Sequence, residues 1–237
     1  MDEKVKGIVV SSKDYKDNDK LLTLFTLEKG IVFAKIVGVK KPNAKLKAVK
    51  ELFCFAEFDL ARKGDFLTIT SANIIESFHN LTSDIEKFYA GCLILEVIKT
   101  VVKENQSNEL LFLETLKSLQ AIAFDNISPN LVKARFLIKI FEAMGYRLSL
   151  TKCATCGENF VNKRYFSPSE GSINCPFCKT KDAIEISNLT HSTMRLASET
   201  PFEKLKSLKL SPDALETTLN LLVKNFEIRF DKKLITI

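Results

Sequence analysis

The chain has 237 residues, of which 46% are hydrophobic and 27% are charged, a composition that allows one large or two modest globular domains. Its first ten residues, MDEKVKGIVV, lack the apolar run of a secretory signal, and the chain contains no stretch of about 18 apolar residues. These features argue against a secreted or membrane-spanning protein. We therefore expect a cytoplasmic protein without a membrane partner.

The formal net charge of +6 comes from one segment. Residues 35–50, KIVGVKKPNAKLKAVK, contain six lysines and no acid, whereas the rest of the chain has 29 basic and 29 acidic residues. The six are Lys35, Lys40, Lys41, Lys45, Lys47 and Lys50. This concentration predicts a surface that binds a polyanion, with phosphate as the obvious partner, although a merely solvated loop is the alternative.

Residues 1–79 have the pattern of five short strands, at 5–13, 21–28, 31–39, 52–62 and 66–78. Turns are expected at 14–20, at Lys29-Gly30 and at Lys63-Gly64-Asp65, and the lysine-rich segment separates the third strand from the fourth. Five short antiparallel strands are too few for a sandwich and predict a small barrel of the OB type, with an SH3-like barrel as the alternative.

Aromatic residues bear on how such a barrel would hold a nucleic acid. The chain has no Trp and only four Tyr, and most of its 18 Phe fall at core positions. Tyr15, in the first turn, is the best candidate for stacking on a base. We therefore expect binding to be mainly electrostatic.

From about residue 82 the apolar residues recur at helical spacing. Ser83-Asp84-Ile85-Glu86 has the capping-box pattern and predicts a helix that runs to about Lys103. A second helix is expected at 107–124, and Ser128-Pro129 predicts the start of a third that ends near Gly145.

Helical patterns resume after the cysteine region. Thr200-Pro201-Phe202-Glu203 is another possible capping box, and Ser211-Pro212 predicts a last helix towards Phe226. The expected fold class is α+β, with an OB-fold nucleic-acid-binding domain at 1–79 and a helical domain at 80–237. A four-cysteine zinc ribbon is inserted into the helical domain at 150–183.

Two Cys-x-x-Cys pairs carry the most specific signal in the sequence. Cys153 and Cys156 are separated from Cys175 and Cys178 by eighteen residues, which is within the spacing of a four-cysteine zinc ribbon. Four thiolates leave no open coordination position, so we expect one structural zinc ion and no catalytic one. Disulfides are the alternative, disfavoured in a reducing compartment. The other two cysteines, Cys54 and Cys92, lie in apolar patterns and are expected in the core.

Enzyme motifs are missing from the sequence. The two histidines, His79 and His191, have no nucleophile motif near them, and neither a Gly-rich phosphate loop nor a carboxylate cluster for magnesium occurs. Asp14, Asp17 and Asp19 fall in one expected turn, where turn formation explains them. We therefore expect no enzymatic activity and no small-molecule substrate.

The order of the segments resembles the bacterial RecO family of recombination mediators. The resemblance lies in VVSSKDYKDNDKLLTLFTLEKG, VGVKKPNAKLKA, IEKFYAGCLILEVI and FLIKIFEAMGY, followed by CATCGENF and YFSPSEGSINCPFC. It covers most of the chain, although only the cysteine pairs are specific individually. The family's serine after the basic loop is replaced by Ala44, and NFEIRFDKKLITI matches the family's C-terminal segment poorly.

The resemblance implies a mediator of DNA repair that binds single- and double-stranded DNA and anneals complementary strands. It also implies that the protein acts with RecR to load RecA onto DNA coated by single-stranded-DNA-binding protein. The expected place of action is the nucleoid. Family contacts to DNA correspond to Lys40, Lys41, Lys45 and Lys47, with Lys35 and Lys50 as weaker candidates. For the acidic tail of the single-strand-binding protein, Lys133, Arg135 and Lys139 are the residues expected to bind.

Two other classes of protein stay open. A zinc-ribbon scaffold of transcription or translation would use the lysine segment to bind RNA or an acidic protein, and its relative affinity for RNA and DNA would distinguish it. A metal-dependent nuclease or ligase accessory enzyme would need magnesium and clustered acids, and turnover under excess magnesium would distinguish it.

Overall fold

The computed structural model describes residues 2–63, 66–161 and 163–236. The chain forms two compact units, Met1–Leu119 and Gln120–Ile237, each of which is described by itself. The predicted turn at Lys63-Gly64-Asp65 includes Gly64 and Asp65, which lie outside the described residues. The predicted domain division after residue 79 stays a prediction.

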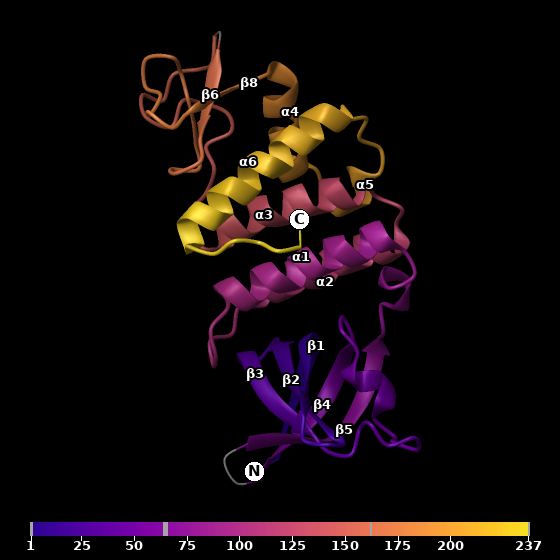
Figure 1. The fold of residues 1–237 in the computed structure, drawn as a ribbon. Helices are drawn as coiled ribbons and strands as arrows, with labels where there is room; N and C mark the ends of the chain where they lie inside the picture. Colours follow the sequence, from indigo (N-terminus) through magenta and orange to yellow (C-terminus); the bar gives the residue numbers. More distant parts are fainter. Residues whose placement is uncertain (1, 64–65, 162, 237) are drawn as a thin grey trace. The chain divides into compact units, whose positions relative to one another are not determined.

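The first unit contains a closed five-stranded barrel (Figure 1). Its strands are β1 (Asp2–Tyr15), β2 (Asp19–Thr26), β3 (Gly30–Ile36), β4 (Phe55–Lys63) and β5 (Phe66–Glu76), in the order β1-β2-β3-β5-β4. The barrel and its five strands are as predicted, but β3 and β5 pair in parallel rather than antiparallel. This closing pair gives the Greek-key barrel of the OB fold, so the SH3-like alternative is set aside.

The barrel interior follows from alternation along the strands. Leu22 and Leu24 of β2, and Val32, Ala34 and Ile36 of β3, are all buried in one core cluster. Irregular register between Val9 and Ser11 of β1 bends that strand and helps the sheet to close. The turn after β1 is shorter than predicted, because Tyr15 still pairs with Asp19.

Two helices complete the first unit, α1 (Ile85–Val101) and most of α2 (Glu109–Phe124). The N-cap of α1 is Asp84, whose carboxylate accepts a hydrogen bond from the Lys87 N–H at 2.9 Å. The predicted Ser83 cap is therefore wrong, because the Ser83 hydroxyl donates instead to the Asn80 carbonyl. A short 3-10 helix, η2 (His79–Leu81), precedes α1.

The second unit is built on α3 (Pro129–Ala143) and α6 (Pro212–Phe230), which pack on each other (Figure 1). Pro129 begins α3 as predicted, and α6 runs one turn beyond the predicted end near Phe226. Between them lie α4 (Asn188–Glu199), which packs on both, and the one-turn α5 (Phe202–Leu205). The capping box predicted at Thr200 is wrong, because Thr200 ends α4 and Pro201 precedes α5 without a side-chain cap.

A small ribbon is inserted between α3 and α4. Its sheet has the order β7-β6-β8, formed by β6 (Arg164–Ser167), β7 (Ser172–Asn174) and β8 (Ile184–Ile186). The α+β class and the inserted cysteine module are thus confirmed. Within the ranges given above, no helix has both the length and the apolar character needed to cross a membrane.

Candidate metal centre and nucleic-acid interface

The four ribbon cysteines come together as predicted. The sulfur atoms of Cys153, Cys156, Cys175 and Cys178 all lie within 4.8 Å of one another. A tetrahedral ion with metal–sulfur bonds of about 2.3 Å needs sulfurs about 3.8 Å apart, so the cluster fits such a donor set. The four cysteines can therefore hold one metal ion.

Backbone hydrogen bonds shape the two turns that carry the cysteines. The Gly157 N–H donates to the Cys153 carbonyl at 3.0 Å, and the Cys178 N–H donates to the Cys175 carbonyl at 3.1 Å. Gly157 has a φ of +74°, a left-handed conformation that glycine adopts without strain. The Cys175 N–H also lies 3.4 Å from the Cys153 sulfur, which links one turn to the other.

The cysteine environments favour one thiolate in particular. Burial acts to raise the pKa of Cys153, but N–H donors from Cys156, Cys175 and Thr155 outweigh it and lower that pKa to about 6. The neighbouring thiols, Cys175 first, raise the pKa of Cys178 to about 12. Crowded thiols cannot all ionise without a cation among them, so the cluster is arranged for a positive ion.

The ribbon is fastened to α6 at its β6–β7 turn. Asn225 donates to the Pro168 carbonyl at 2.6 Å, and Arg229 donates to the Glu170 carbonyl at 2.6 Å. A Cβ at Gly171 would lie only 2.9 Å from the Asn225 amide, so a larger residue would push the turn away from the helix. These contacts hold the metal cluster on a long helix.

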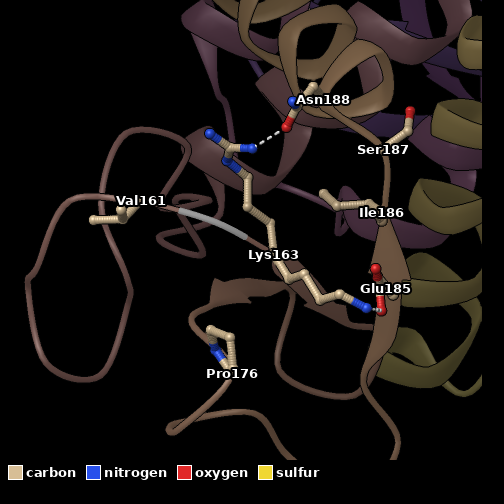
Figure 2. Close-up of a pocket in the computed structure, with 8 residues that line it drawn as sticks. Val161, Lys163, Pro176, Glu185, Ile186, Ser187 and Asn188 are labelled. Atoms are coloured by element: carbon tan, nitrogen blue, oxygen red, sulfur yellow. Dashed lines mark hydrogen bonds and ion pairs between the residues drawn. The ribbon is translucent and has the colours of Figure 1, made fainter.

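A hollow of about 730 Å³ lies beside the cluster, lined by residues of the ribbon and the start of α4. Figure 2 shows Lys163 reaching Glu185, at 3.0 Å, with Ser187 and Asn188 at the start of α4. Arg164 hydrogen-bonds Asn188. The two basic side chains that line the hollow are therefore engaged, Lys163 within the ribbon and Arg164 with the first residue of α4.

The six lysines of residues 35–50 divide into two groups. Three lie in ion pairs, Lys35 with Asp19 at 3.2 Å, Lys40 with Asp14 at 3.1 Å, and Lys50 with Glu51. The other three, Lys41, Lys45 and Lys47, are exposed and form no ion pair within the described ranges. Only the second group presents uncompensated charge to a phosphate.

Acids of the first turn anchor the base of this lysine segment. The Gly38 N–H donates to the Asp19 carboxylate at 2.8 Å. This hydrogen bond is the main cause that lowers the pKa of Asp19, and Lys35 lowers it further. Hydrogen bonds from Lys20 and then Lys40 lower the pKa of Asp14. Both carboxylates thus stay ionised and hold the segment to the end of β1, through Asp14, and to the start of β2, through Asp19, a role beyond the turn formation expected from the sequence.

Tyr15 lies at the end of β1, beside this segment. The Lys35 ammonium lies 5.4 Å from its ring centroid, and the Phe66 ring lies 6.0 Å away. The structure therefore brings together Tyr15 and Lys35, two of the predicted site residues. Two further aromatic residues, Phe33 and Phe66, are 42% and 43% exposed and were not among the residues predicted from the sequence. The alternation of IVFAKI, which places Phe33 on the same face as Lys35, was the available signal.

The three residues expected to bind a partner lie on α3. Lys133 and Arg135 are buried, and Arg135 donates to the carbonyls of Ala197 and Thr200, at 3.0 and 2.8 Å, at the end of α4. Lys139 pairs with Glu142 at 2.7 Å. These contacts stabilise the second unit, and partner binding by the three residues stays a prediction.

Comparison with known proteins identifies the family. The family model described as "Recombination protein O N terminal" matches residues 1–78, and "Recombination protein O C terminal" matches residues 82–234. A "DNA repair protein RecO" of Desulforamulus reducens is 30% identical over 237 residues, covering 98% of this chain and 91% of its own. The protein of the same name from Clostridium novyi is 28% identical over 230 residues, covering 97% and 90%. The chain therefore belongs to the RecO family of DNA repair proteins.

Proposed function

We propose that the chain is a non-enzymatic recombination mediator that binds single- and double-stranded DNA and anneals complementary strands. With RecR, it promotes loading of RecA onto DNA coated by single-stranded-DNA-binding protein, whose acidic tail it also binds. Its place of action is the cytoplasm, at the nucleoid. The observation that carries the proposal is the group of three exposed, unpaired lysines on an OB barrel, in a chain of the RecO family.

Annealing follows from this arrangement without an energy source. Lys41, Lys45 and Lys47 neutralise phosphates, which lowers the mutual repulsion of two strands and raises their local concentration. Because such contacts ignore base identity, any complementary pair is accelerated. The acceleration weakens with salt, since it depends on the release of counterions.

The metal ion of the ribbon is zinc, held by Cys153, Cys156, Cys175 and Cys178. Zinc prefers a tetrahedral set of thiolates, and four protein ligands leave it no position for a substrate or water. The ion stabilises the ribbon and takes no part in chemistry. Because ribbon and ion lie on α6, in the second unit, DNA binding by the barrel needs neither of them.

The first test is fluorescence-detected annealing of two complementary oligonucleotides, without nucleotide, at low and moderate salt. The intact protein should accelerate annealing, and Lys41→Gln/Lys45→Gln/Lys47→Gln should lose most of this acceleration. A matched control, Lys204→Gln/Lys206→Gln/Lys209→Gln, removes the same charge from exposed lysines of the second unit. Equal annealing by the two variants would refute the role of the lysine segment.

A second measurement separates this proposal from an RNA-binding scaffold. Affinities for DNA and RNA strands of matched length and sequence should be similar or favour DNA. A clear preference for RNA, together with no annealing by folded and metal-loaded protein, would move the assignment to the scaffold.

A further inference from the structure

The outer face of the barrel carries exposed aromatic rings that lie outside the lysine segment. Val32, Ala34 and Ile36 point into the core, so Phe33 of β3 points outward. Ala34 of β3 pairs with Leu67 of β5. The residues directly before them are Phe33 and Phe66, so the two rings lie next to each other on neighbouring strands. Close to half of each side chain is exposed, 42% and 43% respectively.

Tyr15 extends this pair of rings into a cluster of three. Its ring lies 6.0 Å from that of Phe66, at 52° to it. The ammonium groups of Lys35 and Lys16 lie 5.4 and 5.7 Å from the Tyr15 centroid, within reach of a cation–π contact. A single exposed ring needs no explanation, but a Tyr15–Phe66 contact beside the Phe33–Phe66 pair, bordered by cations, forms a surface.

A hollow of about 710 Å³ lies against Phe33 within the first unit, large enough for a nucleotide. Three exposed lysines line it, Lys13 of β1, Lys99 of α1 and Lys103 just after α1, and they form no ion pair in the part of the chain described here. Glu104 is the acid in the lining. Ser11 and Thr23 lie beside Phe33 in one cross-strand row and supply hydroxyl groups.

A second hollow of about 330 Å³ also has Phe33 in its lining. It is lined by both Phe33 and Phe66, with Arg62 and Lys29 as its basic residues. Lys29 is paired with Glu3, and the charge of Arg62 is balanced by that of Glu104, so this lining has no net charge. Phe33 is thus shared by two hollows, of which the first, with three lysines against Glu104, is basic.

We infer that Tyr15, Phe33 and Phe66 form a stacking platform for unpaired nucleobases, with Lys13, Lys99 and Lys103 binding the phosphates beside them. This inference rests on the proposed function, because it requires that the barrel binds DNA. Every base has a π-face, so such a platform tolerates any sequence. In a duplex both faces of a base are covered by its neighbours, so the platform selects single strands. Binding of single strands then has two contributions that can be measured separately, stacking of bases and contacts with phosphates, in place of the mainly electrostatic binding predicted from the sequence.

The test compares Phe33→Leu with the intact chain for three probes of equal length: a thymidine strand, the same strand with abasic sites throughout, and a duplex. Phe33→Leu should weaken binding of the thymidine strand by about tenfold, the usual effect of losing one stacked base. It should leave the duplex and abasic affinities unchanged. The intact chain should itself bind the abasic strand more than tenfold less tightly than the thymidine strand, because every ring of the platform then loses its base.

Further variants make the result specific to the ring. Phe33→Trp should restore thymidine-strand binding, and Phe66→Leu should repeat the loss on the neighbouring strand. Tyr89→Leu is the matched control, because Tyr89 is an aromatic residue of α1 that is 48% exposed and lines neither hollow. Salt dependence should be the same in Phe33→Leu and the intact chain, since no phosphate contact is lost.

The outcomes separate this inference from the proposed function. If Phe33→Leu binds the thymidine strand as tightly as the intact chain, while the triple lysine variant loses both strand and duplex, the platform is refuted and DNA binding stands. If intact, folded protein binds none of the probes, the proposed function itself fails. Equal affinity for thymidine and abasic strands would also refute the platform.

Discussion

Asp84 shows how a helix start is chosen among neighbouring polar residues. Both Ser83 and Asp84 could cap α1, but Asp84 has the extended backbone of an N-cap, with φ −134° and ψ 129°. Its carboxylate also carries a full negative charge at the positive end of the helix. Ser83 instead closes the preceding 3-10 turn.

Substitution of Asp84 should therefore lower the stability more than substitution of Ser83. Asp84→Ala should lower the free energy of unfolding by about 1 kcal/mol, because the Lys87 N–H loses its acceptor. Ser83→Ala, the adjacent control, should cost clearly less. Urea unfolding followed by circular dichroism measures both, and a larger loss for Ser83→Ala would show that the sequence-based cap was right after all.

His191 should make stability depend on pH. Burial has the largest effect on the pKa of His191 and lowers it. The Leu150 carbonyl, 2.7 Å from the ring nitrogen, acts to raise this pKa, and the charges of Arg164 and Arg195 lower it further. The folded pKa is thus below the unfolded value of about 6.5, so the unfolded chain binds more protons in the interval between them. This part of the stability is present above pH of about 6.5 and is lost as the pH falls towards the folded pKa.

His191→Gln should keep a donor for the Leu150 carbonyl and remove this titration. Stability between about pH 7 and pH 5 should then fall less steeply than in the intact chain. His79→Gln is the control, because His79 is the other histidine and is exposed. Thermal unfolding at closely spaced pH values measures the slopes, and parallel curves for all three proteins would contradict this assignment.

These residues also show where sequence reasoning succeeds and where it stops. The spacing of the cysteines predicted their meeting, because two Cys-x-x-Cys turns can point four sulfurs at one place. Charge counting found the lysine segment, but it could not show that Asp14 of β1 and Asp19 of β2 pair with two of its lysines. The exposure of Phe33 depends on strand register, which is set by long-range pairing rather than by local pattern.

At the scale of elements, the ribbon is a short sheet with four cysteines that can hold a metal ion. Its three strands have four, three and three residues, too few to fold by hydrophobic burial alone. If the ribbon holds the proposed ion, the ion and the contacts with α6 would supply most of its stability. The barrel, in the other compact unit, has a core of its own.

Removal of the metal should destabilise the ribbon and leave the barrel unaffected. A chelator, or Cys178→Ser, should lower the melting temperature of the second unit by roughly 10 °C, from the loss of several kcal/mol. Protease cleavage should appear between Lys152 and Lys181, while strand binding by the barrel persists. Cys92→Ser removes a cysteine outside the cluster and should change neither metal content nor cleavage. Loss of DNA binding in chelator-treated protein would contradict the independence of the two elements.

The lysine segment is an element whose role can be read from salt dependence. If Lys41, Lys45 and Lys47 each neutralise one phosphate, their replacement by Gln should make the log–log salt slope for single strands shallower by about 2. Anisotropy titrations over a range of salt concentrations measure this slope. The triple variant at Lys204, Lys206 and Lys209 has the same net charge and should keep the full slope. Equal slopes would mean that net charge, and not this segment, governs binding.

At the scale of the whole molecule, the barrel is covered by helices that follow it in the chain. Phe25 and Phe55 pack on Phe112 of α2, with ring centroids 5.3 and 5.9 Å apart, and Phe53 packs on Phe88 of α1 at 6.0 Å. A Cβ at Gly91 would lie 2.8 Å from the Phe53 ring, so α1 fits closely there. Although the strands end at Glu76, the compact unit continues to Leu119.

A fragment of residues 1–126 should therefore fold, whereas a fragment of residues 1–79 should not fold to a stable barrel. Loss of the helices would expose three buried Phe rings, and burial of each contributes about 2 kcal/mol, so roughly 6 kcal/mol would be lost. That loss is comparable to the whole stability of an ordinary domain. Urea unfolding and amide dispersion in NMR spectra of the two fragments measure the difference. A cooperative, well-dispersed fragment of residues 1–79 would instead support a domain boundary directly after the last strand, because the helices would then add nothing that the barrel requires.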